Sequence, residues 1–180
     1  MRYSTLNLAR NTQIRRADEF EGKILEIVED SFTRGEGSPD ADFEATAILI
    51  SGDRKPIWLE LGKYFREGAD KTYVGEVLLP NAARENQALR LALIRHVVKT
   101  GPTPGDEVGA EFVEVEFFQR NNPTADAVWA PVTRYTTRAP TLGAWRALGA
   151  GEDLSGFMVD GILAAMNEES QSATFPSRSG

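Results

Sequence analysis

The sequence predicts a mainly β protein, a small five-stranded barrel of the OB type with one or two helices and a C-terminal helical appendage. The prediction depends on the order of patterned segments: three strand-like runs, one helical run, then two more strand-like runs. In chain order these segments are Phe20–Phe32, Phe43–Ile50, Ile57–Leu61, Asn81–Gly101, Glu107–Phe118 and Ala127–Arg138. A meander of three strands, a helix and two further strands is the order of an OB barrel.

The first three strands are predicted from composition and alternation. Phe20–Phe32 is rich in residues that favour strands, and Gly22 stands near its start, where a barrel strand often bends. Phe43–Ile50 and Ile57–Leu61 flank the turn sequence SGDRKP, which predicts a hairpin. In the second strand of this hairpin the aliphatic residues alternate with Trp58, so Trp58 is expected on the outer face.

Residues 62–80 predict a loop and, over Thr72–Leu79, a short extra strand. The loop interleaves cations with aromatic rings, a mixture that suits base stacking combined with phosphate contact. These residues are Lys63, Tyr64, Phe65, Arg66 and Lys71. The alternative interpretation is that the two aromatic rings close the open end of the barrel.

The segment from Asn81 to Gly101 predicts the helix. Asn81 can cap its N-terminus, and Leu89, Leu93 and Val97 form an apolar stripe at helical spacing. Gly101, followed by two prolines, is a typical helix end. In an OB barrel such a helix closes one end, so its apolar stripe is expected to be core.

The last two strands are joined by a turn-like loop, QRNNPTAD. Pro131 cannot donate a hydrogen bond to a neighbouring strand, so the final strand is expected at an edge or with a bulge there. Glu114 and Glu116 share one face of the preceding strand, where they are expected to be exposed and to serve solubility.

Length and composition indicate a globular protein of one domain with appendages. We expect an N-terminal arm (1–17), the barrel (18–140), a C-terminal helical extension (141–167) and a disordered tail (168–180). The chain has no cysteine, which excludes disulfides and thiolate chemistry, and it contains neither a membrane-length apolar run nor a secretory signal. A cytoplasmic location is expected, the host cytoplasm if the protein is encoded by a phage.

No catalytic or metal site is predicted. The sequence lacks a P-loop, a GxSxG elbow, an HExxH motif and a dinucleotide-binding glycine motif. The single histidine, His96, has neither a cysteine nor a second histidine to share a metal, so a surface or edge-of-core position is expected for it. We therefore expect no cofactor and no enzymatic activity, although a site built from Asp and Glu alone would leave no motif.

The run PGDEVGAEFVEVE, a polar loop and then WAPVTRYTTR resembles a pattern in phage-encoded OB-fold proteins that bind single-stranded DNA. The matching residues are Gly105, Asp106, Val108, Pro131, Arg134 and Tyr135, and the early Gly22-Lys23-Ile24 also fits. The resemblance extends over about residues 18–140. The chain departs from the family in its single loop arginine, Arg120, and in a C-terminus without the acidic, aromatic tail that recruits replication proteins.

The resemblance implies a non-catalytic protein of DNA replication or recombination that binds single-stranded nucleic acid, with DNA as the expected partner. Bases would stack on aromatic rings while cations contact the phosphates. The expected binding residues are Lys23, Arg54, Lys55, Trp58, Lys63, Tyr64, Arg66, Arg120, Trp129, Arg134 and Tyr135. Further partners would be replication proteins, or a second copy bound through the C-terminal helix. Core packing is the alternative role for each aromatic ring.

The charge of the chain stands against this function. The net charge is −7, and the first 140 residues carry −4 of it, so the expected barrel is itself acidic. Nucleic-acid binding depends on basic surface, which here can only be local. The acidic balance favours an alternative, in which the same barrel binds protein as a virion or anti-defence accessory factor.

Overall fold

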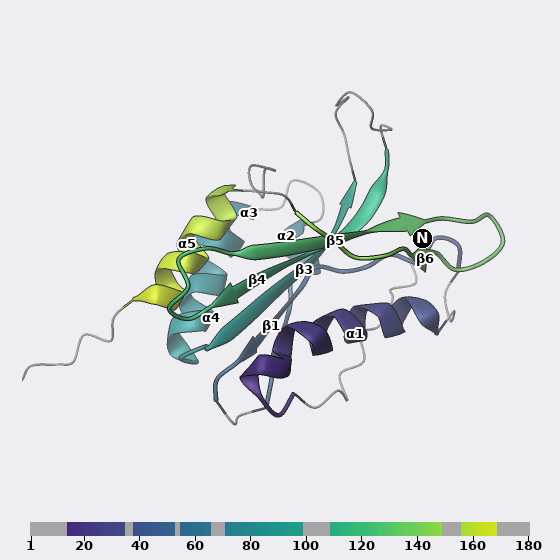
Figure 1. Cartoon of the computed structure of the whole chain (residues 1–180). Coiled ribbons are helices and arrows are strands. Elements are labelled where there is room, and N and C mark those ends of the chain that lie inside the picture. The colour runs from purple at the N-terminus through teal and green to yellow at the C-terminus, as the bar shows by residue number, and fades with distance from the viewer. Residues whose placement is uncertain are drawn as a thin grey trace, which may run out of the picture.

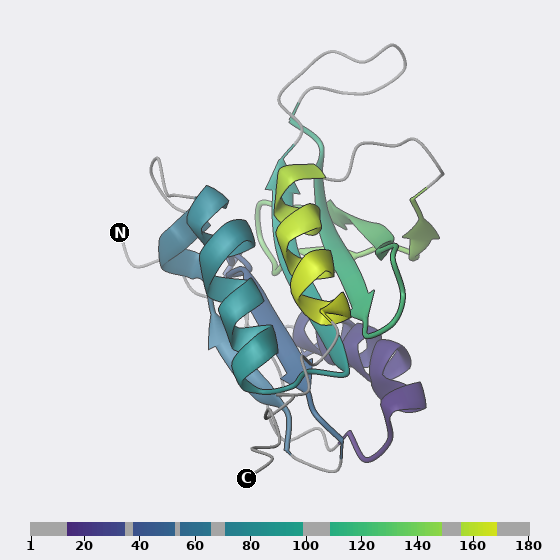
Figure 2. The same ribbon diagram turned by 90° about the vertical axis from the view of Figure 1, so that its left-hand side faces the viewer.

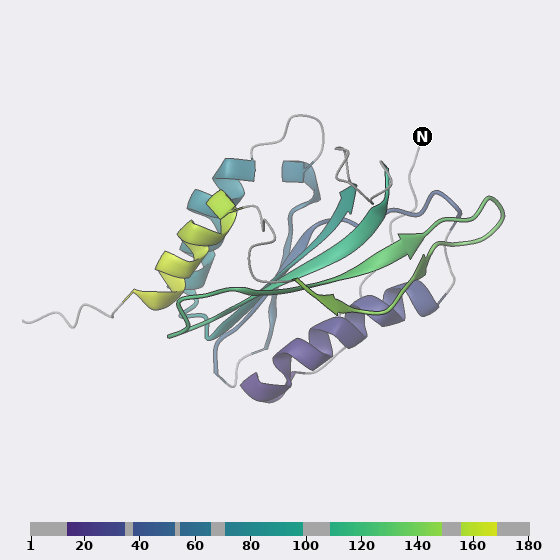
Figure 3. The same cartoon turned by 45° about the horizontal axis from the view of Figure 1, so that its top comes forward.

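The computed structural model describes residues 14–34, 38–52, 55–65, 71–98, 109–148 and 156–168. The protein is mainly β, with one strongly curled antiparallel sheet between helices (Figures 1 and 3). The strands are β1 (Thr46–Ile50), β2 (Ile57–Glu60), β3 (Arg90–Val98), β4 (Glu111–Gln119), β5 (Asp126–Thr133), β6 (Thr141–Leu142) and β7 (Arg146–Ala147). The helices are η1 (Ala17–Glu19), α1 (Phe20–Thr33), α2 (Gly62–Phe65), α3 (Lys71–Tyr73), η2 (Val74–Leu78), α4 (Leu79–Glu85) and α5 (Gly156–Asn167).

The sheet runs in the order β2-β1-β3-β4-β5, and both β6 and β7 pair with the outer side of β5. The predicted hairpin is confirmed, because β1 and β2 pair antiparallel with Thr46 opposite Glu60. The strand predicted over 107–118 is confirmed from Glu111 onward as β4, and the one predicted over 127–138 is confirmed as β5 only as far as Thr133, after which the chain leaves the strand. Seven strands form the sheet within the described residues, where five were predicted.

Pro131 lies where β5 changes its outer neighbour from β7 to β6. Its carbonyl oxygen accepts a hydrogen bond from the Gly143 backbone N–H at 2.8 Å. The backbone N and C=O of Pro131 therefore face away from β4. The missing proline N–H thus falls in the gap between two short edge strands, in agreement with the expected edge position.

Each face of the sheet has its own hydrophobic core. On one face Ile48, Ala92 and Ile94 pack under α1, which supplies Phe20, Ile24 and Ile27. On the other face, residues of β1 and β3 pack against η2, α4 and α5. Figure 2 shows α4 in teal and α5 in yellow side by side over this second face.

The strand predicted over Phe20–Phe32 is wrong, because this segment is helix α1. Its buried residues follow the helical period, namely Phe20, Ile24, Ile27, Val28, Ser31 and Phe32. This spacing places them on one face, which packs against the sheet. The many β-branched residues of the segment are compatible with a helix because tertiary burial outweighs their weak helix propensity.

The helix predicted over Asn81–Gly101 is also wrong beyond its first residues. Helix α4 ends at Glu85, where Gln87 adopts the left-handed conformation at φ 49°. The Gln87 N–H donates to the carbonyl oxygen of Arg84, and the Ala88 N–H donates to that of Ala83, at 3.1 and 2.9 Å. These two bonds form a Schellman motif, after which the chain enters β3. The extra strand predicted over Thr72–Leu79 is likewise wrong, since this segment is helical.

Helix α5 confirms the predicted C-terminal helix, and its apolar side is used within the same chain. Val159, Ile162, Ala165 and Met166 are buried in the core that α4 and η2 share. The sheet continues into β6 and β7, so no structural break occurs at the predicted boundary after residue 140. Most of the predicted arm (1–17) and tail (168–180) lies outside the described residues. No helix in the described ranges has the length and apolar character needed to cross a membrane.

Gly161 allows a close approach between α5 and η2. A Cβ atom at this position would run into the backbone carbonyl oxygen of Gly75. Gly22, in α1, has nothing within 4 Å of an added Cβ atom. The two helical glycines therefore differ in what an alanine would meet.

We predict that Gly161→Ala lowers the free energy of unfolding by about 1–3 kcal/mol, because the methyl group forces the two helices apart. Gly22→Ala is the control, and we expect it to stabilise the protein by up to about 1 kcal/mol through helix propensity. Urea unfolding monitored by circular dichroism measures both. Stabilisation by both substitutions would contradict the close helix contact.

Candidate nucleic-acid interface

The two tryptophans predicted to form one stacking platform lie on opposite faces of the sheet. Trp58 pairs with Ile48 and packs, half-buried, into the core under α1. Trp129 pairs with Glu114 on the face that carries α4 and α5. Three strands, β1, β3 and β4, separate them. The structure therefore does not bring these two rings together.

Two predicted residues near the β2 end of the sheet form a stacked pair. The Lys63 ammonium lies 4.8 Å from the centre of the Tyr64 ring, and Tyr64 contacts Tyr73 at 5.7 Å between ring centres. Tyr64 also packs, half-buried, against the core of the α4 face, which agrees with the alternative of a ring that closes the fold. Lys55 is exposed just before β2.

The remaining predicted cations are scattered. Lys23 on α1 forms an ion pair with Glu26 at 2.9 Å. Arg120 lies in the turn after β4, where its backbone N–H donates to the carbonyl oxygen of Leu89. Arg54 and Arg66 fall outside the described residues, as do Gly105, Asp106 and Val108 of the resemblance.

Trp129, Arg134 and Tyr135 follow one another along the chain: Trp129 lies on β5, on the face of α4 and α5, and the other two come just after the strand. Arg138 and Arg146, which are not among the expected binding residues, lie over Tyr135 and Trp129, and Trp145 lies on the opposite face, against the core under α1. The Arg138 guanidinium lies 3.8 Å from the centre of the Tyr135 ring, and that of Arg146 lies 5.2 Å from the Trp129 ring. We call Trp129, Tyr135, Arg138, Trp145 and Arg146 the β5 edge.

Further contacts hold these rings in place. Phe112 packs edge-on against Trp129 with 5.8 Å between ring centres. Tyr135 Oη lies 3.3 Å from Thr141 Oγ1, and this hydrogen bond is the main reason why the pKa of Tyr135 is lowered. The rings are half-buried, whereas Arg138 and Arg146 are exposed. The β5 edge thus presents two cations on fixed aromatic supports.

The β5 edge lies in a basic stretch of an acidic chain. Residues 127–148 contain three arginines and no Asp or Glu, although the whole chain carries −7. The predicted domain boundary after residue 140 divides this stretch in two. The absence of acidic residues across that boundary, together with the pairs Arg134-Tyr135 and Trp145-Arg146, is the signal that could have identified the β5 edge.

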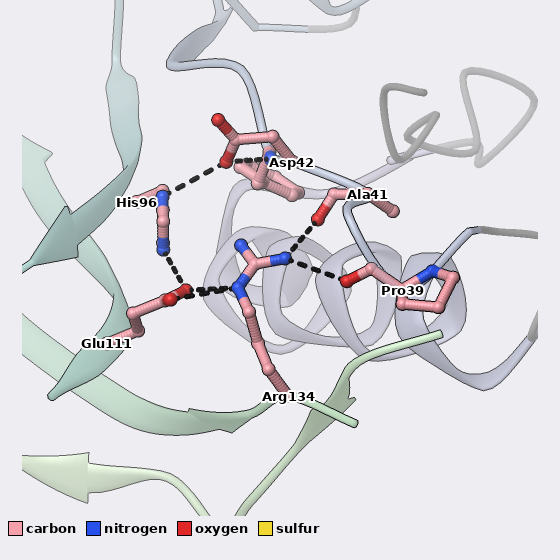
Figure 4. A network of polar contacts seen from close by, with 7 residues as sticks. Pro39, Ala41, Asp42, His96, Glu111 and Arg134 are labelled. Carbon is pink, nitrogen blue, oxygen red and sulfur yellow. Dashed lines mark hydrogen bonds and ion pairs between the residues drawn. The ribbon is translucent and has the colours of Figure 1, made fainter. Parts of the chain in front are cut away.

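Arg134 itself has a structural task. Its Nε donates to Glu111 Oε1 and Oε2 at 2.8 and 2.7 Å. Its Nη1 donates to the carbonyl oxygens of Ala41 at 2.8 Å and Pro39 at 3.3 Å (Figure 4). A guanidinium held by this many acceptors fixes the segment before β1 to the end of β5, so these contacts give Arg134 a structural role in place of the predicted phosphate contact.

His96 completes this network from β3. Its Nδ1 lies 3.0 Å from Asp42 Oδ1 and its Nε2 lies 2.8 Å from Glu111 Oε2 (Figure 4). The hydrogen bond to Asp42 is the main cause that raises the pKa of His96, and the same bond lowers the pKa of Asp42. Both ring nitrogens are engaged by carboxylates, so the imidazolium acts as a clamp. Among the residues that the structure describes, no cluster suited to a metal ion occurs.

Glu114 and Glu116 are buried, which corrects the expectation of an exposed face. The Arg95 guanidinium contacts both carboxylates, at 2.9 Å for Glu114. The side chain of Glu116 is fully buried under the helices of the second face. Burial is the main cause that raises the pKa of Glu116 to about 7; Glu114 adds to it and the Arg95 charge opposes it. One guanidinium can neutralise the charge of only one of these two carboxylates. Protonation of Glu116 therefore stabilises the folded state.

A groove of 730 Å³ lies between the last turns of α1 and the segment 138–145. Glu29 and Phe32 line it from α1, and Arg138, Leu142 and Trp145 line it from the other side. The Trp145 Nε1–H donates to Glu29 Oε1 at 2.8 Å and so joins the two walls. The groove opens at the β5 edge, with which it shares Arg138 and Trp145.

No family model matches the chain, and no curated protein or solved structure matches it either. The resemblance to phage single-stranded-DNA-binding proteins therefore stays a prediction. The candidate site depends on the geometry of the β5 edge alone.

The pKa of Glu116 predicts how stability varies with pH. Because it is raised in the folded state, its contribution is full below the ordinary value near 4.5 and is lost as the pH rises to about 7. We predict that wild-type protein loses on the order of 2 kcal/mol of unfolding free energy over this window, and that Glu116→Gln removes most of the loss. Urea unfolding between pH 4.5 and 7.5 measures it. An identical pH profile in the two proteins would refute the assignment.

His96 predicts a second window, which begins near pH 6.5 and extends to higher pH. Its raised pKa means that the clamp stabilises the fold fully below about pH 6.5 and weakens as the pH rises through the folded-state value. In His96→Gln we expect a lower stability at pH 6 and a flatter profile between pH 6.5 and 9 than in wild type. The same urea series carried to pH 9 tests this, and a slope unchanged by the substitution would count against a charged clamp.

Proposed function

We propose that the protein is a non-catalytic module that binds single-stranded nucleic acid, with DNA as the first candidate, along the β5 edge. The observation that carries this proposal is the pair of exposed arginines, Arg138 and Arg146, each of which lies over a half-buried aromatic ring, at 3.8 and 5.2 Å from the ring centre. Arginine is suited to this arrangement because its flat face packs on the ring while its N–H groups still point outward to phosphate oxygens.

The basic character of the β5 edge supports the same ligand. A phosphate backbone is repelled by most of an acidic surface, and residues 127–148 are a stretch without any carboxylate side chain. Trp129 and Trp145 supply rings on opposite faces of this edge, and Tyr135 supplies a third beyond the end of β5. Bases stack on such rings with little sequence preference. Lys55, Lys63 and Tyr64 were also predicted to bind. They lie at the opposite side of the sheet, so this proposal does not include them.

The OB-like character of the fold belongs to this proposal as well. The curled antiparallel sheet supports it, and OB barrels bind strands across such a curved surface and its loops. The strand path is not a simple meander, because β3 pairs with β1 and not with β2. The resemblance adds a proposed role in DNA replication or recombination of a phage or bacterium. The rest of the protein surface is acidic and would limit contact with the nucleic acid to one strand.

The test is fluorescence anisotropy with a labelled 15-nucleotide oligonucleotide, titrated at several salt concentrations. We predict that Arg138→Gln combined with Arg146→Gln lowers affinity at least about tenfold at low salt and reduces the salt slope by about 1.4, since each phosphate contact on a single strand contributes about 0.7. Both side chains are exposed, so the double variant should keep its fold.

The matched control is Lys55→Gln combined with Lys63→Gln. It removes two exposed cations, one of them also stacked on a ring, from the other side of the sheet. We expect little change in affinity. Equal losses in both double variants would indicate diffuse electrostatic binding, and no binding by wild type at low salt would favour the protein-interaction alternative.

A further inference from the structure

The groove beside the β5 edge combines three kinds of chemistry. Trp145 offers a ring whose indole N–H is fixed by Glu29, and Phe32 and Leu142 give apolar walls. Glu29 is a carboxylate and hence an acceptor only. Arg138 stands at the boundary between the groove and the β5 edge, where it stacks on Tyr135.

These groups fit one part of a nucleic-acid strand. A flat, partly apolar ring can enter a space of 730 Å³, which is within the range of small-ligand sites. The phosphate attached to that nucleotide would remain outside, near Arg138. Glu29 keeps acceptor capacity after accepting the bond from Trp145, because a carboxylate has about four lone-pair positions.

We propose that this groove takes one unstacked nucleobase that carries an amino group, and that Glu29 selects it. This inference rests on the proposed function. Cytosine presents an N4 amino donor where thymine presents an O4 acceptor. The Glu29 carboxylate accepts a hydrogen bond from the amino group, whereas it repels the oxygen of thymine. The groove thus gives the β5 edge a base preference that stacking alone does not supply.

The experiment compares labelled 15-nucleotide oligo-dC and oligo-dT at pH 8, where oligo-dC is unstructured, using fluorescence anisotropy. We expect wild type to bind oligo-dC about fivefold more tightly than oligo-dT, less than a full bidentate base contact would give. Glu29→Gln should abolish or reverse this preference, because the amide both donates and accepts. Its oxygen can still accept the bond from Trp145, which keeps the groove wall in place.

Asp30→Asn is the control, since it removes a carboxylate from the neighbouring exposed position of α1 that does not line the groove. It should leave the preference for oligo-dC unchanged. Tight binding of both oligonucleotides without preference, or an equal effect of Glu29→Gln on both, overturns the base groove and leaves the β5 edge intact. Failure of wild type to bind either oligonucleotide overturns the proposed function and this inference with it.

Discussion

The burial of β3 on both of its faces is the constraint on which the rest of the structure depends. Leu91 and Leu93 point into the core under α4 and α5, and Ala92 and Ile94 point into the core under α1. All four are fully buried, so this strand must lie in the middle of the sheet and needs a helical layer on each side. Helix α1 and the group η2, α4 and α5 supply these layers, and the glycine contact between α5 and η2 lets the second layer pack closely.

Coverage of both faces decides where a ligand can bind. An OB barrel exposes one face of its sheet, whereas here the middle of each face is core. One accessible part is the side of the sheet beyond β5, where β6 and β7 are only two residues long; the edge strand β2 lies at the other end. The arginines and rings of the β5 edge lie along the side beyond β5. The partly exposed network of His96, Asp42, Glu111 and Arg134 fixes the end of β5 to the segment before β1, so the proposed binding edge is held in place by groups outside it.

Strands with clear alternation could be predicted from the sequence, and those without it could not. The hairpin β1–β2 and the pair β4–β5 were found from their patterns and turns. The run from Leu91 to Ile94 is apolar at every position, and such a run has no period that separates a strand from a buried helix. In α1 the spacing of Phe20, Ile24 and Ile27 is helical. The β-branched residues of the same segment favour a strand, and the strand prediction followed from them. Of the β5 edge, Trp129 and Tyr135 could be predicted as binding residues, whereas Trp145 and Arg146 depend on the pairing of β7 with β5, which a two-residue strand does not reveal in a sequence.

The most direct test of the central claim is hydrogen–deuterium exchange read by mass spectrometry, with and without a saturating single-stranded oligonucleotide. If both faces of the sheet are closed and the ligand binds beyond β5, exchange slows in peptides that cover residues 126–148 and does not change in those that cover 55–65 and 71–85. Slower exchange over 55–65 and 71–85, with none over 126–148, would contradict the account.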